Sequence, residues 1–305
     1  MKKGKISNEQ LHGVLIPITT PMNSSGEIKI KSFEENLQRL ARLTVGGFVI
    51  CGSTGEMPYL RPDERLRLYK SARRIVKPPK LLIASTGLES TKETICLSRK
   101  AENLGVDLLL VITPNYFRSK MTSEALEAHY EAIAERIQIP LMIYSIPQFT
   151  GIKMDPSSIA KIGQHSNIIG IKESSGNASY AKRILQLAPP NFKVFLGSPM
   201  LLLKGLRWGS AGGILGISNF VPEICVGLYS AFLRKDWKRA QVLQRELSRL
   251  GRKINIPFGV AGVKAAMDHR GLIGGFVRSP LSPLTKKERS LVASLLKKYK
   301  ALEDQ

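Results

Sequence analysis

Short apolar runs rich in β-branched residues recur along the chain, and each is followed by a turn and a stretch with helical periodicity. Eight of these runs read as strands: residues 14–19, 48–51, 81–85, 108–112, 141–144, 168–172, 194–196 and 213–217. The segments between them space apolar positions by three and four, as a helix with one buried face requires: residues 33–43, 63–76, 91–104, 123–136, 157–163, 178–187 and 201–208. The pattern therefore predicts strands that alternate with helices.

Two segments show the local signals most clearly. Within residues 33–43, an apolar side chain recurs at Phe33, Leu37, Leu40 and Leu43, which lie on one helical face. Ahead of residues 91–104, Ser90 precedes Glu93 by three positions, the order of a capping box.

The strand runs are continuously apolar rather than alternating, which is typical of parallel strands covered by helices on both faces. Eight such units close most naturally into a (β/α)₈ TIM barrel. A doubly wound sheet is the second choice, because the stretch ITTPMNSSGE after the first apolar residues holds no glycine-rich nucleotide fingerprint.

Further helical segments follow the eighth strand: residues 222–233, 237–250, 260–269 and 286–299, with Pro257 and residues 280–283 as breaks. The sequence therefore predicts a barrel catalytic domain over residues 1–222 and a C-terminal helical extension over residues 223–305, packed on the barrel.

Composition narrows the class of protein. The chain of 305 residues is 43% hydrophobic and 23% charged, which fits a globular chain with a sizeable core. No stretch approaches the ~20 apolar residues of a membrane helix, and the start MKKGKISNEQLHG lacks a secretory apolar segment, so we expect no membrane association and a cytoplasmic location. The cysteines and histidines show no metal-ligand spacing, and we expect neither metal nor cofactor: Cys51, Cys96, Cys225, His12, His129, His165 and His269.

The charge balance is unusual, since 46 Lys and Arg against 24 Asp and Glu give +22. The basic residues are spread over residues 2–5, 61–80, 234–252 and 286–300, which favours a solvated enzyme surface over a nucleic-acid motif. On this pattern we therefore expect no nucleic-acid partner, although an RNA-binding or anion-binding barrel stays an alternative. Either interpretation implies attraction of anionic substrates.

Active sites of such barrels form at the carboxyl ends of the strands, where Lys172 closes the apolar run 168–171. A buried ammonium is costly, and only the neutral amine attacks a carbonyl, so this position suits a Schiff-base lysine. Gly170, two positions earlier, leaves room beside the lysine stem. The alternative is a lysine that extends along the barrel rim to reach water.

Other polar residues fall at neighbouring strand ends. Tyr144 ends the preceding strand, where a phenol beside an amine suggests proton transfer, or a rim tyrosine packed against a loop. Residues 52–56, GSTGE, offer the Ser53 and Thr54 hydroxyls and backbone N–H groups to a carboxylate, or form a plain turn in which Glu56 starts a helix. Tyr116 adds a further phenol after the fourth strand.

Four motifs stand in order at these strand ends: GSTGE at 52–56, TPNYF at 113–117, YSIPQFTG at 144–151 and GIKES at 170–174. With them the chain resembles the dihydrodipicolinate synthase and N-acetylneuraminate lyase superfamily from about Gly13 onward. The resemblance implies a class I aldolase or lyase on a (β/α)₈ barrel, without metal or cofactor. It also implies a homo-oligomer, a dimer or a tetramer, that acts on a small 2-oxo acid with a pyruvate moiety.

The resemblance also suggests catalytic roles. Lys172 matches the lysine that forms an imine with the keto group of pyruvate, and Tyr144 the general acid/base, with Thr54 relaying protons. Tyr116 matches a tyrosine that reaches across a dimer interface into the neighbouring site.

Substrate-binding residues are implied in the same way. Ser53 and Thr54 match the pair that holds the pyruvyl carboxylate, while Gly197 and Leu215 match the wall around the pyruvyl group.

Departures from the family pattern bear on the second substrate. Phe149 stands where the resemblance gives the synthases an arginine for the aldehyde's carboxylate, and a phenyl ring cannot make that contact, although Gln148 or a basic residue elsewhere could substitute. The residues at positions 145, 118 and 115 (Ser145, Arg118 and Asn115) resemble the pattern of 4-hydroxy-2-oxoglutarate aldolases more closely. We therefore expect cleavage of a 4-hydroxy-2-oxo acid, with dihydrodipicolinate synthase as the alternative.

Overall fold

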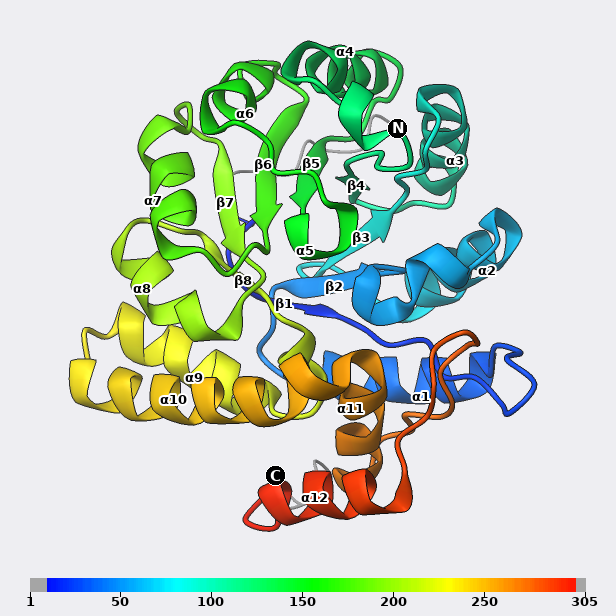
Figure 1. The fold of residues 1–305 in the computed structure, drawn as a ribbon, viewed down its shortest axis with the longest axis vertical. Coiled ribbons are helices and arrows are strands. Elements are labelled where there is room, and N and C mark those ends of the chain that lie inside the picture. Colours follow the sequence, from blue (N-terminus) through cyan, green and yellow to red (C-terminus); the bar gives the residue numbers. More distant parts are fainter. Residues whose placement is uncertain (1–9, 300–305) are drawn as a thin grey trace.

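The computed structural model describes residues 10–299, in which eight parallel strands close a barrel in sequence order and β1 pairs with both β2 and β8 (Figure 1). The strands are β1 (Gly13–Pro17), β2 (Gly47–Ile50), β3 (Leu81–Ser85), β4 (Leu108–Ile112), β5 (Leu141–Ser145), β6 (Ile168–Glu173), β7 (Lys193–Leu196) and β8 (Gly212–Ile214). The predicted TIM barrel with C-terminal helices is confirmed. The expected basic cluster at residues 2–5 and the predicted extension beyond residue 299 lie outside the described residues.

Helices surround the barrel and continue beyond it (Figure 1). They are α1 (Ile30–Ala41), α2 (Pro62–Ile75), α3 (Thr91–Asn103), α4 (Ser123–Ala134), α5 (Pro147–Thr150), α6 (Pro156–Ile162), α7 (Ala178–Leu187), α8 (Leu202–Arg207), α9 (Pro222–Leu233), α10 (Trp237–Leu250), α11 (Ile256–His269) and α12 (Lys286–Leu296). The predicted helices are present with ends shifted by a few residues, and the four-residue α5 was not predicted.

The strands bury both faces, as their unbroken apolar runs predict. Every residue of β1 to β5 is buried. Alternate side chains fill the barrel interior, among them Leu15, Ile83, Leu110, Met142 and Phe195, while the others pack outward in a second layer against the helices. The interior is therefore a packed core that leaves the chemistry to the strand ends.

Local signals explain individual elements. Phe33, Leu37 and Leu40 of α1 are fully buried, and the Ser90 hydroxyl caps α3 by accepting the Glu93 N–H at 3.4 Å. The interpretation of Gly170 was wrong, because a Cβ there would lie 2.3 Å from the backbone oxygen of Lys193. This glycine allows the close approach of β7 rather than making room for the lysine stem.

The C-terminal helices lie along one side of the barrel, and α12 packs on α11 at the far end from the strands (Figure 1). Helix α9 packs on β1 and α8, and α10 packs on α9. Helix α11 starts earlier than predicted and kinks at Gly259, whose φ of 50° interrupts it. The division at residue 222 stays a prediction. Over the described residues 10–299, no helix is long and apolar enough to span a membrane.

Candidate active site

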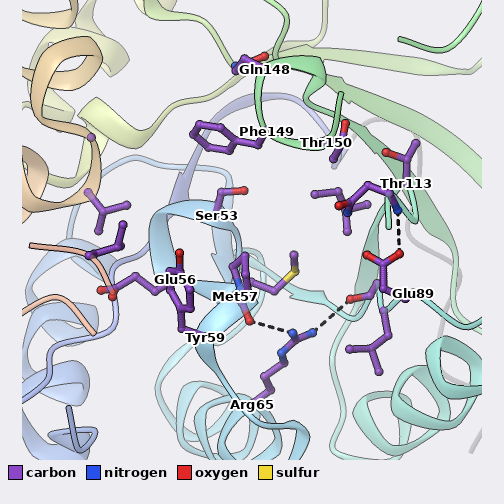
Figure 2. A pocket seen from close by; sticks show the side chains of 18 of the residues that line it. Ser53, Glu56, Met57, Tyr59, Arg65, Glu89, Thr113, Gln148, Phe149 and Thr150 are labelled. Atoms are coloured by element: carbon purple, nitrogen blue, oxygen red, sulfur yellow. Dashed lines mark hydrogen bonds between the residues drawn. The ribbon is translucent and has the colours of Figure 1, made fainter. Parts of the chain in front are cut away.

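A cavity of about 760 Å³ opens at the carboxyl ends of the strands. Its walls come from the loops after β2, β3, β4 and β5, and also from residues 258–261 of α11 and residues 281–282. In Figure 2, Ser53 and Phe149 lie on one side of this cavity, and Thr113 and Glu89 lie on the other. The barrel and the C-terminal part of the chain therefore form one site together.

Lys172 and Tyr144 lie side by side at two neighbouring strand ends, in register across the β5–β6 pair. Their exposed fractions are 3% and 1%, and Lys172 Nζ lies 4.0 Å from the centroid of the Tyr144 ring. Whenever the amine carries a proton, the face of this ring stabilises the charge. The pairing of β5 with β6 fixes the separation of Lys172 and Tyr144, as the sequence predicts for residues at the ends of neighbouring strands.

Ser53 links this pair to the cavity that it lines. Its Oγ lies 3.1 Å from the Tyr144 hydroxyl, so the two form a hydrogen bond in which either can donate. Thr54 Oγ1 faces the end of β8, 3.2 Å from where a Cβ on Gly216 would stand. Among the described residues, the hydroxyl bound to Tyr144 is therefore that of Ser53, with Thr54 beside it.

Glu56 does not start a helix, so that alternative for the GSTGE turn was wrong. It has φ 61° and ψ 36°, and it separates two 3₁₀ turns, Ser53–Gly55 and Met57–Tyr59. Helix α2 begins only at Pro62, where proline suits the first helical turn.

The two residues expected to form the pyruvyl wall follow β7 and β8. A Cβ on Gly197 would lie 1.8 Å from Ser174 Oγ, so only glycine lets the turn after β6 approach. Leu215 is fully buried and belongs to the outer layer of the core, which leaves its backbone to face the barrel axis. Their role as a wall stays a prediction.

The rim residues are placed differently. Tyr116 and Phe149 are 78% and 71% exposed, and only Phe149 lines the cavity. The Glu89 carboxylate accepts the backbone N–H groups of Asn115 and Tyr116 at 2.8 and 2.9 Å, which fixes the loop after β4. The Tyr116 ring meets that of Phe117 edge to face at 5.1 Å and turns outward.

Three polar side chains lie near the part of the site expected to take the second substrate: Arg65, Gln148 and Arg118. Arg65 lines the cavity. It is 3% exposed, and its guanidinium donates hydrogen bonds to the backbone oxygens of residues 57, 60 and 87. Gln148 donates its amide to the Ser174 carbonyl at 2.7 Å. Arg118 lies against Gly151, where a Cβ would stand 2.7 Å from its Cδ and Nη1. Arg65, the one arginine among the described residues that line the cavity, is thus hydrogen-bonded to backbone carbonyls.

The sequence analysis missed the contribution of the C-terminal segment. A π-helical turn, Gly251–Asn255, precedes α11 and brings Asn255 to 3.7 Å from the Cβ position of Gly216. The buried Oδ1 of Asn255 has no hydrogen-bond partner. π-Helical turns often mark functional sites, and the signal in the sequence was Pro257 within an otherwise helical pattern.

Glu173, next to Lys172 along β6, lies on the outer side of the strand. Burial raises the pKa of its carboxyl group, and its Oε1 accepts the Ser175 N–H at 2.5 Å. Within residues 10–299, no group of three His, Cys, Asp or Glu side chains is placed to hold a metal ion.

Comparisons with known proteins cover almost the whole chain. The model of the dihydrodipicolinate synthetase family matches residues 10–299. A 4-hydroxy-tetrahydrodipicolinate synthase of Moorella thermoacetica is 34% identical over 93% of this chain and 97% of its own length, and one of Geobacter metallireducens is 32% identical over 95% and 99%. Among solved structures, Escherichia coli YagE in complex with pyruvate, a prophage protein of the dihydrodipicolinic acid synthase family, has a TM-score of 0.89 at 27% identity, covering 96% of this chain and 98% of its own.

Proposed function

The chain belongs to the dihydrodipicolinate synthetase family, and from this premise we propose that it is a lyase in which Lys172 forms an imine with the keto carbon of pyruvate or of a pyruvyl substrate. The observation that carries the proposal is the position of Lys172 Nζ, buried and 4.0 Å from the Tyr144 ring centroid at the floor of the barrel mouth. The pyruvate bound to YagE supports the same class of substrate.

The proposed chemistry uses the amine as the nucleophile. The neutral Lys172 amine adds to the keto carbon, and loss of water gives a protonated imine, which withdraws electrons from C3. Loss of a C3 proton then gives the enamine that attacks an aldehyde, and the reverse sequence cleaves the bond between C3 and C4. Water finally hydrolyses the imine and regenerates the amine.

Tyr144 is proposed to move the protons. Its hydroxyl is hydrogen-bonded to Ser53 Oγ at 3.1 Å, which gives a path between the buried pair and the cavity. Ser53 and Thr54 are proposed to bind the pyruvyl carboxylate, and Thr54 is proposed to assist the proton transfer. Gly197 and Leu215 close the pocket around the methyl end.

Two reactions compete for the second substrate. The names of the relatives favour condensation of pyruvate with aspartate semialdehyde, the reaction of 4-hydroxy-tetrahydrodipicolinate synthases. The phenyl ring of Phe149 on the cavity wall weakens the semialdehyde reaction, because it cannot replace the arginine that the resemblance gives the synthases at this position. The likeness of Ser145, Arg118 and Asn115 to the aldolase pattern favours cleavage of 4-hydroxy-2-oxoglutarate to pyruvate and glyoxylate.

The imine is tested by trapping. Sodium borohydride added with pyruvate should reduce the imine and add a pyruvyl-derived mass to Lys172, located by peptide mass spectrometry. A mass on another lysine, or none, would overturn the proposal. Parallel assays of semialdehyde condensation and of 4-hydroxy-2-oxoglutarate cleavage then rank the two second substrates.

We also propose that Tyr116 completes the active site of a second copy in a homo-oligomer. Its 78% exposed ring, on a loop fixed by Glu89, supports this arrangement. Mixing an inactive Lys172 variant with an inactive Tyr116 variant tests it, because a shared site regains activity only when the two chains assemble.

A further inference from the structure

A buried ion pair joins the GSTGE turn to the C-terminal segment. Glu56 Oε1 lies 2.5 Å from Nζ of Lys264 in α11, and the two side chains are 0% and 2% exposed. Among the described residues, no hydrogen bond or ion pair joins Glu56 or Lys264 to Lys172. The pair therefore acts on the site through the turn that carries Glu56.

Over the part of the chain that the structure describes, Glu56 Oε1 has no hydrogen-bond partner apart from this ion pair. Lys264 Nζ also donates hydrogen bonds to the Thr20 carbonyl at 2.8 Å and to the Phe276 carbonyl at 2.6 Å. The other oxygen of Glu56 accepts the Arg278 N–H at 2.7 Å. An ammonium has three donors, so this geometry leaves Lys264 a single orientation. Burial lowers the pKa of Lys264, and the Glu56 charge opposes that shift.

The turn needs such an anchor. Glu56 is a non-glycine residue at φ 61°, a conformation that is unfavourable for residues with a Cβ unless the surrounding structure fixes it. The Glu56 N–H donates to the Ser53 carbonyl at 3.0 Å, and the Gly55 carbonyl accepts the Thr20 hydroxyl at 2.8 Å. The backbone position of Glu56 thereby sets the 3₁₀ turn that presents Ser53 and Thr54.

We propose that Glu56 and Lys264 are positioning residues for the pyruvyl carboxylate: their buried ion pair holds the left-handed turn in which Ser53 and Thr54 face the substrate. This inference rests on the proposed function. It gives the C-terminal segment a role in substrate binding, in addition to lining the cavity.

A second, partly buried ion pair in the same part of the molecule provides the control. Arg270, after α11, is fully buried and lies 3.0 Å from Glu223 of α9, whose side chain is 29% exposed, and neither residue lines the active-site cavity. Removing the carboxylate of either pair leaves a buried cation and lowers stability. Breaking the Glu56 pair alone should change the binding of pyruvate.

The experiment compares Glu56→Gln, Lys264→Met and the double variant with Glu223→Gln in the full-length enzyme. Steady-state kinetics should give a KM for pyruvate raised about tenfold or more by Glu56→Gln, with a smaller fall in kcat. The double variant, which buries no charge, should fold even where Lys264→Met does not, and should show the same raised KM. Glu223→Gln should lower the melting temperature with an unchanged KM.

The outcomes separate this inference from the proposed function. A wild-type enzyme without a borohydride adduct on Lys172 contradicts the proposed function itself. Where the adduct forms, a wild-type KM in both Glu56→Gln and the double variant overturns the positioning role. An equal rise of KM in Glu223→Gln overturns it too, because that result assigns the effect to general loss of stability.

Discussion

The floor and the rim of the barrel mouth differ in how the fold holds their functional side chains. At the floor, Lys172 and Tyr144 stand on paired strands and are at most 3% exposed. At the rim, Tyr116 and Phe149 stand on the connections that follow β4 and β5, Phe149 within the four-residue α5, and they are 78% and 71% exposed. The sheet fixes the geometry of the floor, whereas the loops can change a rim side chain without disturbing the core.

The difference assigns separate tasks to the two regions. A buried, registered pair suits the bond-making step that every substrate shares, and exposed loop residues suit the choice of second substrate or a contact with a second copy. Substitutions at the floor should therefore abolish turnover, and substitutions at the rim should redirect it.

The most severe test of the floor is Lys172→Arg. Arginine keeps the positive charge but cannot form an imine, so turnover should fall at least about ten-thousandfold, as for loss of other covalent nucleophiles. Pyruvate turnover and borohydride labelling of the purified variant measure the effect. Turnover close to that of the wild type would show that the reaction does not need an imine on Lys172, and the proposed difference in task between floor and rim would be wrong.

Tyr144→Phe should cause the next largest loss. It removes only the hydroxyl that contacts Ser53, so kcat should fall roughly 10²- to 10⁴-fold while the Lys172 adduct still forms. Tyr130→Phe is the matched control, since Tyr130 is also fully buried but bonds the Val111 carbonyl outside the active-site cavity. Equal losses of kcat in the two variants would argue against proton transfer by Tyr144.

Phe149→Arg tests the rim. A guanidinium on the cavity wall can pair with the carboxylate of aspartate semialdehyde, which is worth about 1.5–3 kcal/mol, so kcat/KM for this substrate should rise about 10- to 100-fold over that of the wild type. Phe117→Arg adds the same charge at a 68% exposed position that does not line the cavity. If both variants raise kcat/KM equally, overall charge rather than position is responsible.

The sequence was sufficient for the floor because strand periodicity alone places Lys172 and Tyr144. Each ends a continuous apolar run, and parallel neighbours bring such ends together. The family resemblance added roles to these positions, but their adjacency followed from the pattern and is confirmed by the register.

Contacts distant along the chain were beyond the sequence. Glu56 looked like the start of a helix, yet it adopts a left-handed conformation and pairs with Lys264, and no local pattern encodes that pairing. Residues 258–261 of α11 line the cavity, and Asn255 approaches Gly216, although both segments are distant in sequence from the strand ends that they meet. The loop that carries Tyr116 is likewise fixed by Glu89, from another loop.

The smallest effect concerns the layer behind the rim, where His129 of α4 is 5% exposed and its Nδ1 lies 2.8 Å from Thr91 Oγ1 of α3. Burial lowers the pKa of His129 to about 4, and the nearby Glu89 charge opposes this shift.

Since the unfolded side chain titrates near 6.5, the unfolded state binds more protons as the pH falls, and the free energy of unfolding should drop by about 1 kcal/mol between pH 7 and pH 5.5. His129→Gln should remove this part of the pH dependence, so the melting temperature of the wild type should fall about 2 °C further than that of the variant over the same interval. Equal falls in the melting temperature of the two proteins would show that protonation of His129 does not destabilise the layer behind the rim. That layer would then be no more sensitive to acid than the floor.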